Sequence, residues 1–200
     1  LRFISGFGQA SSTGSLLFES SNAGNAGVSG SITITTGMSS QGPSGGIAIH
    51  TGNSKDGKAG LISLSIGTGS ANEGGGIKFS GGNVRRALKD STGGSISLLT
   101  GFGAQTSSGN MLLVTPNAGG KGVSGDVRIL SGTSSDGSSG KITFATGNFT
   151  GGRGGEIAMS VGGARSGNGG NVFAHAGTQE SRHSKGGNVM VKGGRGLNAD

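Results

Sequence analysis

Residues 22–37 read NAGNAGVSGSITITTG, and residues 117–132 read NAGGKGVSGDVRILSG. The second stretch begins 95 residues after the first and keeps most of its glycines and its apolar positions. Self-similarity at a fixed distance is typical of repeat architectures, in which each unit contacts mainly its neighbours. The pair therefore predicts an array of similar units instead of a domain with one wide core.

A shorter unit of about 15 residues runs through the whole chain, as repeat proteins require. Each unit has an apolar residue, which we call the anchor, and a second apolar residue two positions later. From the second unit on, glycine stands two residues before the anchor. The anchors are Leu1, Leu16, Ile32, Ile47, Ile62, Ile77, Ile96, Met111, Val127, Ile142, Ile157, Val172 and Val189. The glycines before them are Gly14, Gly30, Gly45, Gly60, Gly75, Gly94, Gly109, Gly125, Gly140, Gly155, Gly170 and Gly187.

This unit favours a short β-strand followed by a turn. Apolar residues two apart share one face of a strand, and the segments between them are rich in Gly, Ser and Asn, which is turn chemistry. The glycine before each anchor indicates either a positive φ angle or a close approach of neighbouring turns. We therefore expect an all-β fold, a β-solenoid of about thirteen 15-residue strand-turn units. Two opposing sheets are the favoured arrangement, although coils of 15 or 45 residues also fit the period.

Six units make one super-repeat of 95 residues. The expected organisation is super-repeat 1 at residues 1–95, super-repeat 2 at residues 96–188, and the start of a third copy at residues 189–200. Because the pattern is under way at Leu1 and is interrupted after Asp200, we expect the chain to be a fragment of a longer array.

The composition argues against an enzyme. Of 200 residues 48 are Gly, none is Cys, Trp or Tyr, and only 12% are charged. The nine carboxylates are dispersed, and no His has a second ligand at metal spacing, so we expect no catalytic residue, no metal and no cofactor. The stretch GKGVSG at residues 120–125 leads into an expected strand, and this is the wrong context for a phosphate-binding loop. Thr33 and Thr35 suit an ice-binding face, but the other units do not repeat the pair.

The net charge of +7 favours acidic partners, and anionic polysaccharide is the candidate. The densest basic cluster is Arg85, Arg86 and Lys89. Nucleic acid fits less well, because without Trp and Tyr the chain has few rings on which bases could stack. No apolar run is long enough to span a membrane.

Residues one and three positions after an anchor should point away from the anchor face. Several of them are large and apolar, and some recur at the 95-residue spacing, which predicts a lateral interface with further copies of the repeat. The candidate interface residues are Ile4, Leu17, Leu99, Leu112, Val114 and Leu130. Asn148, in the sequence Asn148-Phe149-Thr150, is a candidate for N-glycosylation.

The units GVSGSITITTG, GGIAIHTG and GGEIAMSVGG resemble the Gly/Ser-rich tandem-repeat proteins of microalgae and related protists. The resemblance covers nearly the whole chain and implies an extracellular or cell-surface setting, with no catalytic residues to transfer. We therefore expect a structural repeat protein that forms or stacks into an extracellular filament or cell-surface fibre. The alternative is an adhesin-like, glycan-binding or ice-binding module.

Overall fold

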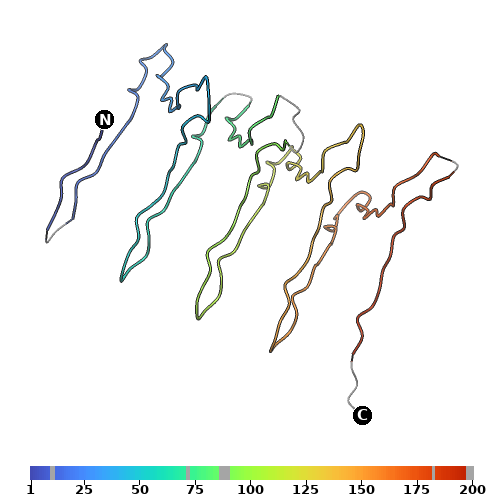
Figure 1. Cartoon of the computed structure of the whole chain (residues 1–200). Coiled ribbons are helices and arrows are strands. Elements are labelled where there is room, and N and C mark those ends of the chain that lie inside the picture. Colours follow the sequence, from blue (N-terminus) through green and yellow to red (C-terminus); the bar gives the residue numbers. More distant parts are fainter. Residues whose placement is uncertain (10–11, 71–72, 86–90, 182, 197–200) are drawn as a thin grey trace. The chain divides into compact units, whose positions relative to one another are not determined.

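The computed structural model describes residues 1–9, 12–70, 73–85, 91–181 and 183–196, and this part of the chain contains no α-helix and no β-strand. The chain divides into two compact parts, unit 1 (Leu1–Leu99) and unit 2 (Thr100–Asp200), and each of them contains several of the 15-residue units. In both units the described residues form extended segments joined by bends and turns (Figure 1). The predicted β-solenoid of thirteen strand-turn units, with two opposing sheets, is therefore wrong, because the described chain is neither a sheet nor a solenoid.

The extended segments lack the hydrogen-bond ladders that would make them strands. Six backbone–backbone hydrogen bonds join described residues, and all six close turns or loops. A folded protein has about one internal hydrogen bond per residue, and about two-thirds of them join backbone groups. The local pattern of apolar residues and glycines is therefore present, but the pairing between segments that the prediction required is missing.

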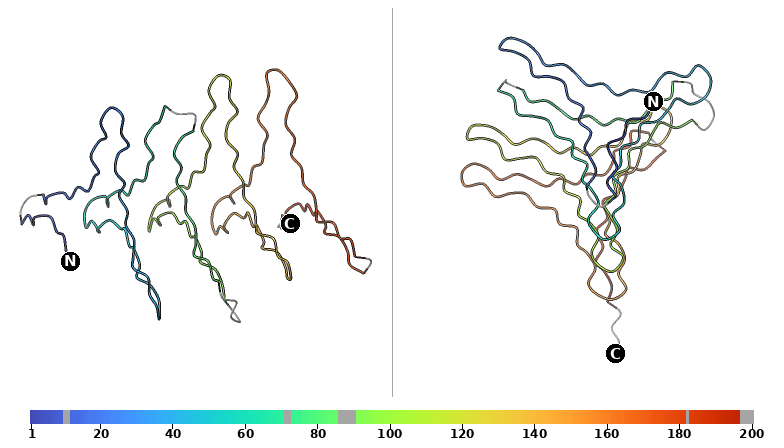
Figure 2. Two further views of the ribbon diagram at one scale, coloured as in Figure 1. Left: turned by 90° about the horizontal axis from the view of Figure 1, so that it is seen from above. Right: turned by 90° about the vertical axis from the view of Figure 1, so that its left-hand side faces the viewer.

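The chain runs out and back in narrow loops, which can be followed from three directions (Figures 1 and 2). Each loop is narrow where the glycine before an anchor meets the residue four or five positions after the preceding anchor, a contact that we call the neck. A Cβ atom added to Gly14 would lie 3.6 Å from Ser5 Cβ, and one added to Gly60 would lie 3.2 Å from Thr51 Cγ2. In unit 2 the corresponding distance from Gly155 to Thr146 Cγ2 is 3.3 Å.

A positive φ angle explains none of the glycines before the anchors, and close approach explains five of the twelve. The glycines with positive φ are Gly42, Gly152 and Gly167, and none of them precedes an anchor by two residues. All twelve glycines before the anchors have neighbouring atoms within 4 Å of an added Cβ. At five of these positions, Gly60, Gly75, Gly94, Gly155 and Gly170, the nearest atom would lie within 3.3 Å of the added Cβ, so a side chain there would force a neighbour to move, whereas at the other seven the contact would be an ordinary one.

Equivalent turns have equivalent hydrogen bonds in the two units. Gly27 N–H donates to the Gly24 carbonyl at 3.3 Å, and 95 residues later Gly122 N–H donates to Gly119 at 3.1 Å. The long loops close in the same way, since Gly94 N–H donates to the Gly82 carbonyl and Gly187 N–H to the Gly177 carbonyl, both at 2.9 Å. The repeated sequence therefore specifies repeated local structure, even without strands.

No described residue is buried, and the described part of the chain has no hydrophobic core. Of the described residues, six are half-buried; four belong to necks and two are a pair of equivalent glycines. They are Ser5, Gly8, Thr51, Gly103, Thr115 and Ala176. The necks are thus the best-packed places in a chain whose other described side chains are exposed to solvent.

Candidate functional site

The apolar side chains of the extended segments form the candidate site, because they are numerous, periodic and exposed. The anchors from Leu16 to Val189 are between 44% and 62% exposed, and the six predicted interface residues between 63% and 85%. Alternate side chains of an extended segment point to opposite sides. The anchors are thus less exposed than the predicted interface residues on the opposite side, whereas the large second apolar residues, on the same side as the anchors, are 57% to 91% exposed.

Two contacts confirm that residues two apart share a side of a segment. Arg128 Nη2 lies 3.0 Å from Asp126 Oδ2, and the rings of Phe173 and His175 stack with their centroids 6.0 Å apart. The ion pair is highly exposed on both sides and contributes little to stability. Both contacts lie on the side opposite the anchors, where charged and ring side chains are mixed with apolar ones.

On the side of the anchors, second apolar residues of consecutive 15-residue units come close to one another in two places. In unit 1 the rings of Phe3 and Phe18 meet edge to face with centroids 6.4 Å apart, a geometry that aromatic pairs favour. In unit 2, Phe144 and Met159 are the second apolar residues of two consecutive 15-residue units. With Ile157 and Ala158 they line an open hollow of about 490 Å³.

The hollow combines an apolar lining with high exposure. Phe144 is 68% exposed, Ile157 56% and Met159 82%. No lining residue carries a polar or charged side chain. Chemically the hollow can therefore hold apolar side chains, and it offers no group that could act as an acid, a base or a nucleophile.

The structure leaves each predicted interface residue exposed on its own segment. Ile4, Leu17 and Leu99 lie in unit 1, and Leu112, Val114 and Leu130 lie in unit 2. Their role in a lateral interface stays a prediction. Sequence reasoning missed the neck residues, although the signal was available: the residue four positions after each of the first twelve anchors is Ser, Thr, Gly, Ala, Val or Ile.

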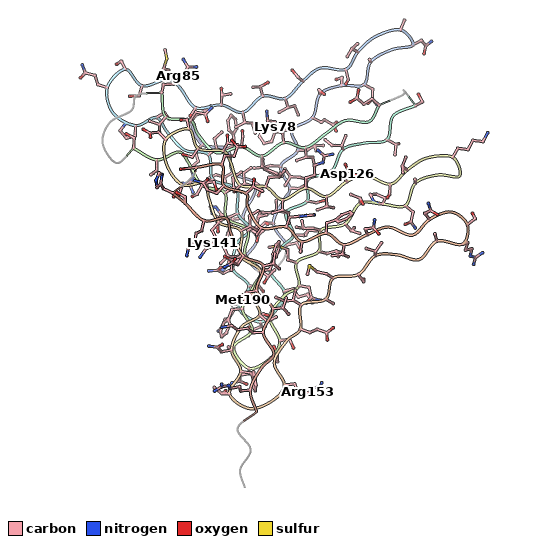
Figure 3. All side chains as sticks on the ribbon, turned by 90° about the vertical axis from the view of Figure 1, so that its right-hand side faces the viewer. Lys78, Arg85, Asp126, Lys141, Arg153 and Met190 are labelled. Atoms are coloured by element: carbon pink, nitrogen blue, oxygen red, sulfur yellow. The ribbon has the colours of Figure 1, made fainter. Side chains whose placement is uncertain are left out.

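Asn148 is exposed in unit 2, two residues before the bend at residues 150–152 and next to Phe149, whose ring packs close to Gly154. Its glycosylation stays a prediction. Of the basic cluster, Arg85 is exposed, and Arg86 and Lys89 lie outside the described residues. Arg153 projects from its loop into the open (Figure 3), and this exposure leaves basic side chains accessible to an acidic partner.

The described residues contain no group of three or more His, Cys, Asp or Glu side chains that could hold a metal ion. His50, His175 and His183 are each exposed. Within the same ranges there is no helix of the length and apolar character needed to cross a membrane.

Comparison of the chain with protein-family models, curated proteins and solved structures gave no match. The proposal below therefore depends on the chain's own geometry and composition.

Proposed function

We propose that this chain is a structural repeat protein that self-associates into an extracellular filament or cell-surface fibre. The proposal does not need a solenoid, since it depends on exposed, periodic apolar side chains and not on sheets within one chain. It assigns no catalysis to the chain, because the candidate site consists of apolar side chains and narrow glycine necks.

The observation that supports it most strongly is the exposed surface. The chain exposes 21170 Å², whereas a folded monomer of 19.2 kDa exposes about 8,400 Å² and an unfolded chain of that mass about 28,000 Å². The excess over a folded monomer is roughly 13,000 Å², far more than the ~800 Å² that one partner buries in a standard interface. Covering it requires many neighbours along the length of the chain.

Further copies of the chain are the partners that fit this surface best. Their apolar pairs and necks recur at the same interval of about 15 residues, so that contacts made by one unit can be repeated by the next. The glycines before the anchors have no side chain, so the backbone at the necks can approach another chain closely. The extracellular setting is the one that the resemblance to Gly/Ser-rich repeat proteins of microalgae implies.

The purified chain is expected to assemble in a concentration-dependent manner into elongated particles. Burial of apolar surface supplies the driving force, and the periodic units allow it to act along the whole length. Sedimentation velocity across a wide range of concentration, with electron microscopy of the largest species, measures this. A single monomeric species at every concentration would contradict the proposal, and glycan binding by that monomer would favour the adhesin-like alternative.

Salt is expected to promote assembly of the chain alone. Each copy carries a net charge of +7, so copies repel one another, and this repulsion is screened as the Debye length falls from about 30 Å at 0.01 M to about 8 Å at 0.15 M salt. We expect the critical concentration to fall several-fold over this range. Assembly held together by an anionic polysaccharide would show the opposite response, because salt weakens contacts between opposite charges.

A further inference from the structure

We propose that Asn168 is a site of spontaneous covalent modification, at which the side chain converts through a succinimide ring into a mixture of aspartate and isoaspartate. Asn168 is the only Asn of the sequence that is followed directly by Gly. The reaction needs water and no enzyme. The inference does not depend on the proposed function, because it concerns the chemistry of one loop in a single chain.

An Asn–Gly step holds a nucleophile and an electrophile next to each other, and such an intramolecular reaction has a large rate advantage. The backbone nitrogen of Gly169 loses its proton to solvent and attacks Cγ of the Asn168 side chain. The bond from this nitrogen to Cγ forms, the Cγ–Nδ2 bond breaks, and ammonia leaves after taking up a proton. Water then opens the ring at either carbonyl carbon. Cleavage of the new bond gives aspartate, and cleavage of the original backbone bond gives isoaspartate.

The structure leaves both reacting groups accessible. Asn168 and Gly169 are exposed and directly follow the bend at residues 165–167. No hydrogen bond between described residues involves the Gly169 amide or the Asn168 side chain. A Cβ atom added to Gly169 would have no neighbouring atom within 4 Å. Nothing that the structure describes around this nitrogen therefore hinders its approach to Cγ.

The two Asp–Gly steps of the chain, at residues 56–57 and 136–137, can form the same ring but are poorer sites. A negatively charged carboxylate resists attack by a nucleophile, whereas the amide group of Asn is neutral. The nitrogen of the first step is also held, because Gly57 N–H donates to Ser54 Oγ at 3.1 Å. Exposure, a free amide and a neutral electrophile thus coincide at Asn168.

The modification changes both the charge and the backbone of this loop. One new carboxylate lowers the net charge of a copy from +7 to +6. Isoaspartate also adds one carbon atom to the main chain, two residues before the neck glycine Gly170. A Cβ atom added to Gly170 would lie 2.9 Å from Val161 Cγ1, so the neck has little room for a longer backbone. We therefore expect the isoaspartate form to loosen this neck.

The test measures the reaction in the intact chain at neutral pH, below the concentration at which it assembles. The chain is incubated in water enriched in heavy oxygen, then digested in ordinary water and analysed by mass spectrometry. We expect Asn168 to take up one heavy oxygen atom and to give both aspartate and isoaspartate. Its conversion should be at least about tenfold faster than that of Asn148, which corresponds to a barrier lower by about 1.4 kcal/mol. Asn148 is also exposed but is followed by Phe.

Gly169→Ala is the variant that tests the mechanism. Gly169 does not have a positive φ angle, and an added Cβ meets no neighbour, so alanine fits the loop. Its methyl group nevertheless hinders the approach of the nitrogen, and we expect conversion of Asn168 to slow several-fold. Gly163→Ala is the matched control, because an added Cβ there also has no atom within 4 Å, and it should leave the rate unchanged.

Equal rates in the parent chain and in Gly169→Ala, or at Asn168 and Asn148, would overturn the proposal. Aspartate as the sole product would also overturn it, because it indicates direct hydrolysis without a ring. A much faster reaction in urea than in buffer would show that the folded loop protects Asn168, which contradicts the accessibility argued above. All of these outcomes concern single chains, so they leave the proposed self-association to its own test.

Discussion

A chain carrying both Leu112→Asp and Val114→Asp is expected to remain monomeric at concentrations where the parent chain assembles. Each of these apolar side chains contributes about 1.5–3 kcal/mol when it passes from exposed to fully buried, and an unpaired carboxylate resists burial more strongly still. At about 1.4 kcal/mol per tenfold change, the critical concentration should rise at least a hundredfold. Sedimentation velocity of parent and variant in the same buffer measures the change.

The direction of this effect separates it from a change in net charge. Two aspartates lower the net charge from +7 to +5, and this weaker repulsion by itself would favour association. The matched control is a chain with Met38→Asp and Val123→Asp, which has the same net charge and alters residues that are 98% and 97% exposed. Equal loss of assembly in the two variants would show that the segment Met111–Val114 has no special part in it.

The sequence predicted the local features of this chain well and its architecture badly. Leu112 and Leu130 are 82% and 81% exposed, more than the anchors of their own segments, Met111 at 52% and Val127 at 60%, and their part in a lateral interface stays a prediction. The glycines before the anchors also belong to a local feature, since each of them lies near residues only eight to twelve positions earlier. Contacts at this range are determined by the loop itself, so the period of 15 residues is enough to indicate them.

The sheets were wrong because they depend on pairing between segments that the pattern cannot supply. Gly loses more conformational freedom on ordering than any other residue, and 48 of the 200 residues are Gly. Each unit offers one apolar pair against this cost, and in the structure even the most sheltered anchor, Ile142, is 44% exposed. A periodic apolar pair thus specifies an extended segment, but it does not specify a neighbour within the same chain.

The candidate site could be predicted in part for the same reason. The exposure of the predicted interface residues follows from alternation along single segments. The hollow instead depends on how two consecutive 15-residue units, which contain Phe144 and Met159, lie relative to each other. Neither residue stands out in the sequence from the second apolar residues of other units. The role of the position four residues after each anchor could have been inferred, because Ser, Thr and other small or β-branched residues recur there.

Replacing Gly94 by alanine is expected to open the neck of the long loop at residues 82–94. A Cβ at this position would lie 2.8 Å from the Gly82 backbone nitrogen, too close for the two backbones to keep their distance. The hydrogen bond from Gly94 N–H to the Gly82 carbonyl, 2.9 Å long, would break. Such a bond contributes about 0.5–1.5 kcal/mol net, so we expect protection of this amide against hydrogen exchange to fall up to about tenfold.

Gly93→Ala is the matched control, because it makes the same chemical change one residue earlier. A Cβ at Gly93 would lie 3.6 Å from the Gly82 carbonyl oxygen, an ordinary contact distance. Both variants reduce the conformational freedom of the unfolded chain equally, so a difference between them reports on the neck alone. Equal amide protection at residue 94 in the two variants would contradict the view that backbone contact at the neck requires glycine. A selective loss in Gly94→Ala would instead show that the necks are ordered in a single chain, before any copies assemble.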